Sequence, residues 1–144
     1  MLLNMGYRVL NQVDEKENFF TAFCEDSLGC AHSRNRKLSQ AKDLHLKSWE
    51  DFSKLHGETS LLCTVEAHLV RDCLLLKDIH EAEAWFQQLL SIHSQLQRPL
   101  PPNIVSLSYQ VISDSLQAGR LDEAQAILRK CSEIADSNLG SFYL

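Results

Sequence analysis

The segment DIHEAEAWF (residues 78–86) recurs in altered form as RLDEAQAIL (residues 120–128), at a shift of 42 positions. Under this shift apolar residues fall on apolar residues, and acidic residues and alanines recur at matching places. The matching pairs are Ile79/Leu121, Glu81/Glu123, Ala82/Ala124, Ala84/Ala126, Phe86/Leu128, Ile92/Ile134, Leu69/Val111, Val70/Ile112, Asp72/Asp114 and Leu74/Leu116. The matches span two helical stretches and the turn between them. A repeated helical hairpin of about 32–34 residues predicts stacked units, because one unit cannot bury its apolar face alone.

Apolar residues recur at helical spacing along almost the whole chain, and glycine and proline are few. We therefore expect an all-α fold of antiparallel hairpins stacked as a short solenoid, with a compact all-α bundle as the alternative. The repeat units are expected over residues 62–93 and 104–135. The expected helices cover residues 2–12, 15–27, 39–55, 60–76, 79–95, 103–118 and 122–135.

Turn and cap residues set the expected boundaries. Asp14 is expected to cap the second helix and Gly29 to end it, which leaves residues 31–40 (AHSRNRKLSQ) as a loop. Gly57 is expected to end the third helix. The segment LQRPLPPN breaks the helical pattern, since proline removes a donor and restricts the residue before it. Helices are then expected to begin at Asp78, Asn103 and Asp122.

The turn within AGRLDEAQAIL (residues 118–128) follows from its residue types. Gly119 tolerates the positive φ that ends a helix. Asp122 and Glu123 then lie at the positive end of the next helix dipole. The small side chain of Ala124 lets the second helix approach the first, and Ile127 and Leu128 are expected to fill the groove that this leaves. In the earlier copy Lys77 replaces the glycine, so that turn is expected to be less relaxed.

The segment AGRLDEAQAIL resembles the turn between the helices of tetratricopeptide (TPR) and pentatricopeptide (PPR) repeats, and PNIVSLSYQVISDSLQ resembles the first helix of a PPR unit. The resemblance covers residues 60–135, with one good copy and one degraded copy. Ile112 stands where a TPR has glycine, and Ser115 lacks the usual aromatic residue. The resemblance implies stacked hairpins with a concave surface for a partner. We expect residues 1–144 to form one helical domain that is a fragment or short form of a longer repeat protein.

Composition excludes several functional classes. The net charge of −5 disfavours general nucleic-acid binding. Neither a membrane span nor a secretory signal is expected, because no apolar run approaches the roughly 20 residues that cross a bilayer and the first residues lack a cleavage motif. The five cysteines are therefore expected to be reduced, in a cytoplasmic or nuclear protein.

The segment CEDSLGCAH places Cys24, Cys30 and His32 close together, which raises the question of zinc. The spacing between the cysteines is too long for a paired ligand motif, and no second pair follows. The six histidines are spread along the sequence, and no nucleophile motif or phosphate loop is present. We therefore expect no metal, no cofactor and no catalytic residue.

Arg34, Arg36 and Lys37 form a small basic segment, and Arg36 stands three residues before Ser39. This pattern fits an RNA-phosphate contact, a nuclear-import element or a phosphorylation site at Ser39, and it equally fits a solvated loop. The leading functional hypothesis is a non-enzymatic scaffold that binds a protein or peptide on its concave face. The alternative is an RNA-associated, PPR-like repeat protein. The sequence does not indicate the oligomeric state.

Overall fold

The computed structural model describes Asn4, residues 18–55 and residues 59–140. The expected helix over residues 2–12, apart from Asn4, and the expected boundaries at Asp14 and Gly57 lie outside the described residues. The described part consists of helices and their connections, with no strand. The helices are α2 (Asn18–Arg34), α3 (Leu38–Ser53), α4 (Thr59–Leu75), α5 (Ile79–Leu96), α6 (Pro102–Gln117) and α7 (Leu121–Gly140). None of these helices is long and apolar enough to span a bilayer.

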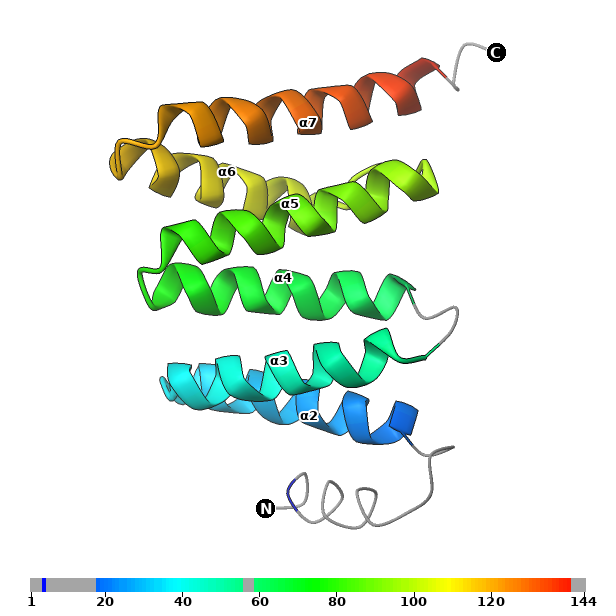
Figure 1. The fold of residues 1–144 in the computed structure, drawn as a ribbon, viewed down its shortest axis with the longest axis vertical. Coiled ribbons are helices and arrows are strands. Elements are labelled where there is room, and N and C mark those ends of the chain that lie inside the picture. The colour runs from blue at the N-terminus through cyan, green and yellow to red at the C-terminus, as the bar shows by residue number, and fades with distance from the viewer. Residues whose placement is uncertain (1–3, 5–17, 56–58, 141–144) are drawn as a thin grey trace.

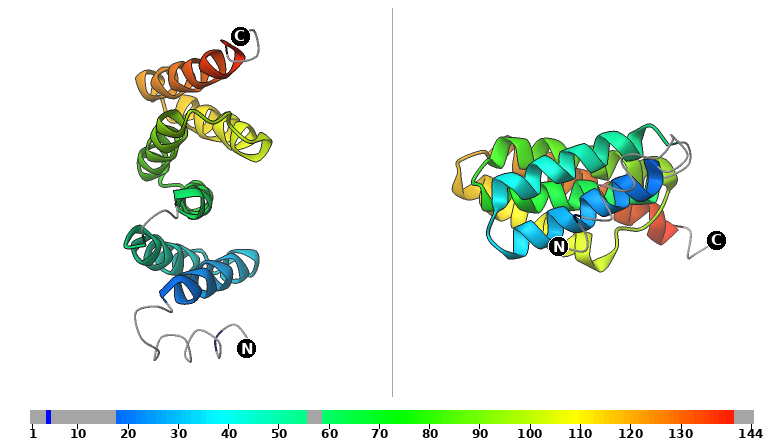
Figure 2. Two further views of the ribbon diagram at one scale, coloured as in Figure 1. Left: turned by 90° about the vertical axis from the view of Figure 1, so that its right-hand side faces the viewer. Right: turned by 90° about the horizontal axis from the view of Figure 1, so that it is seen from below.

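Consecutive helices pair as antiparallel hairpins, α2–α3, α4–α5 and α6–α7, and the hairpins stack in chain order (Figure 1). Seen from the side, α2 and α6 project to one side of the stack, and α3, α5 and α7 lie on the other (Figure 2, left). The stack curves, with α4 set back between α2 and α6. The fold is thus the expected all-α stack of hairpins and not a compact bundle. The expected repeat units fall on α4–α5 and α6–α7.

The three hairpin turns share one backbone conformation. The turn residues Arg36, Lys77 and Gly119 have φ of 62°, 65° and 75°. The residue after each donates its N–H to the carbonyl five residues earlier, which is the pattern that closes a helix on a left-handed residue. These bonds are Lys37 N to His32 O (2.9 Å), Asp78 N to Cys73 O (2.9 Å) and Arg120 N to Ser115 O (2.8 Å). Lys77 therefore forms the same turn as Gly119, with the steric cost of a side chain at positive φ.

The common turn brings α2–α3 into the repeat, which the sequence analysis missed. Ala41, Ala82 and Ala124 each stand five residues after the left-handed residue, and their exposed fractions are 0%, 0% and 3%. The expected loop over residues 31–40 is wrong, because α2 continues to Arg34 and α3 begins at Leu38. The turn was not recognisable in the sequence because arginine replaces glycine at its left-handed position.

Two other expected boundaries are also wrong. Gly29 does not end a helix but lies inside α2, where a Cβ would come within 2.6 Å of the His45 Nε2 atom. The glycine is therefore explained by tertiary packing and not by a turn. Helix α6 begins at Pro102, one residue before the expected cap Asn103. Proline suits this position because its fixed φ is helical and its missing N–H would have no partner in the first turn. Asp78 does cap α5, accepting a hydrogen bond from the Glu81 backbone N–H.

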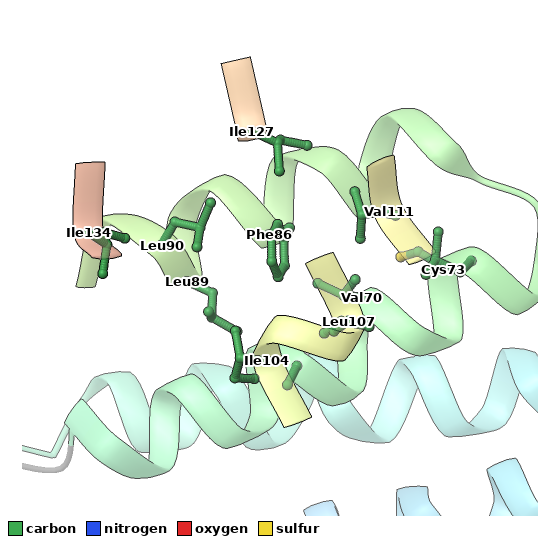
Figure 3. Close-up of a cluster of buried hydrophobic side chains, with 13 residues drawn as sticks. Val70, Cys73, Phe86, Leu89, Leu90, Ile104, Leu107, Val111, Ile127 and Ile134 are labelled. Carbon is green, nitrogen blue, oxygen red and sulfur yellow. The ribbon is translucent and has the colours of Figure 1, made fainter. Parts of the chain in front are cut away.

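Two apolar clusters hold the stack together. The larger cluster draws on all four helices from α4 through α7. It includes Val70, Phe86, Leu89, Leu90, Leu107, Val111 and Ile127 (Figure 3). The smaller joins α2, α3 and α4 through Ala22, Phe52, Val65 and Leu69. Trp85 packs against both clusters and meets Trp49 edge to face, with ring centroids 5.2 Å apart. Adjacent hairpins are therefore joined by a continuous layer of buried side chains.

Leu128 does not fill the groove as expected. Ile127 is fully buried, whereas the Leu128 side chain is 55% exposed. Phe86 occupies the corresponding position in α5 and is fully buried, because α6 and α7 cover it. No described helix follows α7 to cover Leu128 in the same way.

The buried alanine of the last hairpin gives a direct test of the packing. Ala124→Leu is expected to lower the free energy of unfolding by about 1–3 kcal/mol, because the larger side chain forces α6 and α7 apart. Ala126→Leu, at an exposed position of the same helix, is the control and is expected to change stability little. Urea unfolding of both variants measures the difference. Equal stabilities would show that Ala124 is not a close-contact position.

The turn at Lys77 gives a second test. Lys77→Gly is expected to raise the free energy of unfolding by roughly 1 kcal/mol, because it removes a side chain from the left-handed conformation. Lys54 also lies just after a helix, but its φ is −82°. Lys54→Gly is therefore the matched control and is expected not to stabilise the chain. A thermal melt in which Lys77→Gly destabilises the protein would contradict the described turn.

Candidate functional site

A cavity of about 460 Å³ lies between α4, the connection from α5 to α6, and the start of α6. One stripe of α4 supplies a wall, at positions 60, 63, 64, 67, 68 and 71. The end of α5, the connection and the start of α6 supply the rest of the lining, and Pro101 is extended just before α6 begins. The lining consists of Ser60, Cys63, Thr64, Ala67, His68, Arg71, His93, Leu96, Arg98, Pro99, Pro101, Asn103 and Ile104. We call it the α4–α6 cavity.

The α4–α6 cavity combines an apolar floor with positive charge. Cys63, Ala67 and Ile104 are buried in its floor. Arg71 and Arg98 stand at its wall, and none of its described lining residues is acidic. Burial, and then the nearby Arg98 charge, lower the pKa of His93. The cavity therefore presents cationic and apolar groups in a protein whose net charge is −5.

A second group of polar side chains lies where α2, α3 and α4 meet. We call it the cysteine–histidine cluster, and it consists of Asp26, Cys30, His45 and His68. One carboxylate oxygen, the thiol sulfur and one nitrogen of each imidazole lie within 4.8 Å of one another. Local geometry places these groups together, because Asp26 and Cys30 are four residues apart and share one face of α2.

The distances within the cluster are close to contact. The Cys30 Sγ lies 3.7 Å from His45 Nε2 and 3.7 Å from His68 Nδ1. The Asp26 Oδ1 lies 2.8 Å from His68 Nδ1 and 3.6 Å from His45 Nε2. On the far side of the His45 ring, Nδ1 lies 2.5 Å from the buried Asp72 Oδ2. Asp72 stands four residues after His68, so α4 also contributes from a single face.

These contacts shift the titration of the cluster. Burial by itself would raise the pKa of the Cys30 thiol, but hydrogen bonds from His45 and His68 outweigh burial and lower it to about 7. Burial would lower the pKa of both imidazoles. At His45 the hydrogen bonds with Asp72 and Cys30 and the charge of Asp72 together outweigh burial. At His68 the hydrogen bonds with Asp26 and Cys30 and the charges of both do so, and both pKa values rise to about 9. The cluster therefore favours a thiolate beside charged imidazoles.

The sequence analysis grouped Cys30 with Cys24 and His32 and regarded the histidines as scattered. The structure instead places Cys30 with residues from α3 and α4. The spacings of four residues, Asp26 to Cys30 and His68 to Asp72, were the available signal. These spacings alone were insufficient, because they do not show which helices pack against each other.

The order Cys30, His45, Asp72 also resembles a nucleophile, a base and an orienting carboxylate. Acyl transfer additionally needs free N–H donors close to the nucleophile to bind the oxyanion. Cys30 lies inside α2, well before its last residue Arg34, where backbone N–H groups are used within the helix. The arrangement therefore fits a set of metal ligands better than a site for acyl transfer.

A third polar group ties the last two hairpins together. The buried Ser115 hydroxyl donates to Glu83 Oε2 at 2.6 Å, and Arg120 Nε donates to Glu83 Oε1 at 2.7 Å. Ser115 thus uses the position where TPR repeats carry an aromatic residue to satisfy a buried carboxylate. This group is structural, since all its members have partners within the chain.

The sequence-predicted contact residues lie in and beside the α2–α3 turn. Arg34 ends α2, Arg36 is the left-handed turn residue, and Lys37 precedes α3. All three side chains are exposed, as is Ser39 in the first turn of α3. The predicted turn residues of the last hairpin lie in and after the α6–α7 turn. Gly119 has a positive φ, and Asp122 lies in the first turn of α7. Ala124 is buried, and Leu128 is exposed.

Comparison with known proteins supports the fold. A solved structure described as a kinesin light chain with nearly identical TPR-like repeats, from Podosopora anserina, superposes with a TM-score of 0.61 at 17% sequence identity. The similarity covers 92% of this chain and 67% of that one. No family model and no curated protein matches the sequence. The chain therefore has the fold of a TPR-like helical repeat, as its turn sequence implied.

The group around Glu83 yields a stability prediction. Arg120→Ala is expected to lower the free energy of unfolding by about 1–3 kcal/mol, because it leaves a buried carboxylate short of a charged partner. Arg129→Ala, at an exposed position of α7, is the control. Adding Glu83→Gln to Arg120→Ala is expected to recover part of the loss. Chemical denaturation of the three variants measures these differences, and equal losses from both arginine variants would contradict the assignment.

Proposed function

We propose that the chain is a non-enzymatic scaffold module that binds an acidic peptide segment of a protein partner in the α4–α6 cavity. The single observation that carries the proposal is the composition of this cavity, with Arg71 and Arg98 above an apolar floor and no acidic lining residue. An extended segment with one apolar side chain and one or two carboxylates complements both features.

The repeat fold supports this proposal, because stacked hairpins leave their first helices lining one curved face. Two of those first helices, α4 and α6, line the α4–α6 cavity, which supports binding on this face. The cavity volume of about 460 Å³ lies within the range of roughly 300–1,000 Å³ that ligand-binding clefts occupy. A few side chains of a peptide fit such a volume, and a folded domain does not.

A peptide array tests the proposal with defined probes. The array presents short peptides that combine a leucine or phenylalanine with aspartate or glutamate, each beside a copy with asparagine or glutamine in place of the acids. We expect each acidic peptide to bind at least about 10-fold more tightly than its neutral copy, which is a difference of about 1.4 kcal/mol in binding free energy. We also expect this difference to shrink as salt is raised. Fluorescence polarisation of the best pair measures it.

Matched variants locate the binding site. Arg98→Ala removes a cavity cation, and Thr64→Trp fills the cavity from an exposed position of α4. Both variants are expected to bind the acidic peptide at least about 5-fold more weakly, whereas Arg129→Ala on α7 is expected to leave the affinity unchanged. Equal binding of acidic and neutral peptides, or equal loss in all three variants, would overturn the proposal. The RNA hypothesis on Arg34, Arg36 and Lys37 stays a prediction, which a salt-dependent mobility shift with single-stranded RNA tests separately.

A further inference from the structure

We propose that the cysteine–histidine cluster is a binding site for one divalent transition-metal cation of the zinc class. The four ligand atoms come from α2, α3 and α4, so the cation joins the first hairpin to the second. Four protein ligands leave no open position, which is the arrangement of structural zinc sites. The inference does not depend on the proposed peptide-binding function.

The donor set selects the class of metal. One thiolate, two imidazoles and one carboxylate make a mixed sulfur, nitrogen and oxygen site. Hard cations such as Mg²⁺ and Ca²⁺ prefer oxygen ligands throughout, whereas zinc accepts all three donor types.

Three of the distances between ligand atoms are close to those of tetrahedral coordination. Zinc bonds of about 2.0–2.3 Å imply distances of about 3.3–3.6 Å between ligand atoms. Both sulfur–nitrogen distances are 3.7 Å, and Asp26 Oδ1 lies 3.6 Å from His45 Nε2. The distance from Asp26 Oδ1 to His68 Nδ1 is shorter, at 2.8 Å, and must lengthen when a cation replaces the shared proton. The His68 side chain is 22% exposed, so its ring has room to make this adjustment.

The surroundings orient His45 for ligation. Its Nδ1 lies 2.5 Å from the Asp72 carboxylate, which accepts the Nδ1 proton, and this bond turns Nε2 towards Cys30 and Asp26. Metal-ligating histidines almost always have such a carboxylate or carbonyl behind them. The ring lies against the backbone of α2 at Gly29, where a Cβ would be only 2.6 Å from Nε2. A glycine at this helical position is what allows the imidazole to come this close.

The cluster is open to solvent on one side. A cavity of about 190 Å³ is lined by Cys30, His45, His68 and Asp72, together with Ser33, Arg34 and Arg71. This cavity gives a cation a route to the ligand atoms. Without a cation the same side chains form a network of hydrogen bonds and ion pairs, and that is the competing explanation that the experiment must exclude.

Cobalt titration of the full-length chain tests the proposal. After chelator treatment in a reducing buffer free of thiols, Co²⁺ is added and then competed with Zn²⁺. We expect one equivalent of Co²⁺, the visible bands of tetrahedral cobalt and a thiolate-to-cobalt charge-transfer band in the ultraviolet. We expect Zn²⁺ to displace the cobalt and to raise the melting temperature with increasing concentration.

Variants assign the ligands. Cys30→Ser is expected to abolish the charge-transfer band, and His68→Gln to weaken Co²⁺ binding at least 10-fold. Asp72 is expected to act on the cation only through His45, and Asp72→Asn is expected to weaken Co²⁺ binding by about 10–100-fold. Cys24→Ser and His80→Gln are the matched controls, because neither residue belongs to the cluster, and both are expected to bind like the unaltered chain.

The outcomes separate the two explanations. If the chain is folded by circular dichroism and binds no Co²⁺, or if Cys30→Ser keeps the charge-transfer band, the site is a hydrogen-bonded network and the proposal is wrong. If Cys30→Ser does not fold, alkylation of the unaltered chain decides. Zinc is expected to protect Cys30 from iodoacetamide at least 10-fold in rate, measured by peptide mass spectrometry. Unchanged alkylation of Cys30 would overturn the proposal.

Discussion

The close approach of two helices at a buried alanine underlies the rest of this structure. Ala41, Ala82 and Ala124 are each almost wholly buried, each in the second helix of a hairpin and each five residues after a left-handed turn residue. A larger side chain there would separate the helices and expose the apolar faces that join neighbouring hairpins. The apolar layer that joins neighbouring hairpins therefore depends on this repeated contact.

The sequence predicted those parts of the fold that depend on local chemistry. The shift of 42 positions located the α4–α5 and α6–α7 hairpins, because alanine, glutamate and apolar residues recur there at helical spacing. It missed the α2–α3 hairpin, because Arg36 hides a turn that glycine would have marked. Gly29 was misread for a related reason: its role is to admit the His45 ring, which is a tertiary contact. The cysteine–histidine cluster escaped prediction since its side chains come from three helices.

The two junctions between hairpins differ in chemistry. Four residues after the buried alanine, α5 carries Phe86, which packs in the larger apolar cluster. The equivalent residue of α3 is His45, which is 1% exposed and needs polar partners there. Glu66 of α4 is also buried at this junction, beside Trp49 of α3, and burial raises its pKa to about 7. The first junction thus carries a buried polar cluster beside its apolar one.

Helix α4 takes part in both junctions and therefore connects the polar cluster of the first to the apolar cluster of the second. His68 and Arg71 line the α4–α6 cavity and also the small cavity beside the cysteine–histidine cluster. A cation held by His68 would fix one ring on the wall where a peptide binds. Free energies of binding at two sites that share a residue are linked in both directions. If both proposals hold, metal occupancy at the first junction therefore alters peptide affinity at the second, and the peptide alters metal affinity by the same factor.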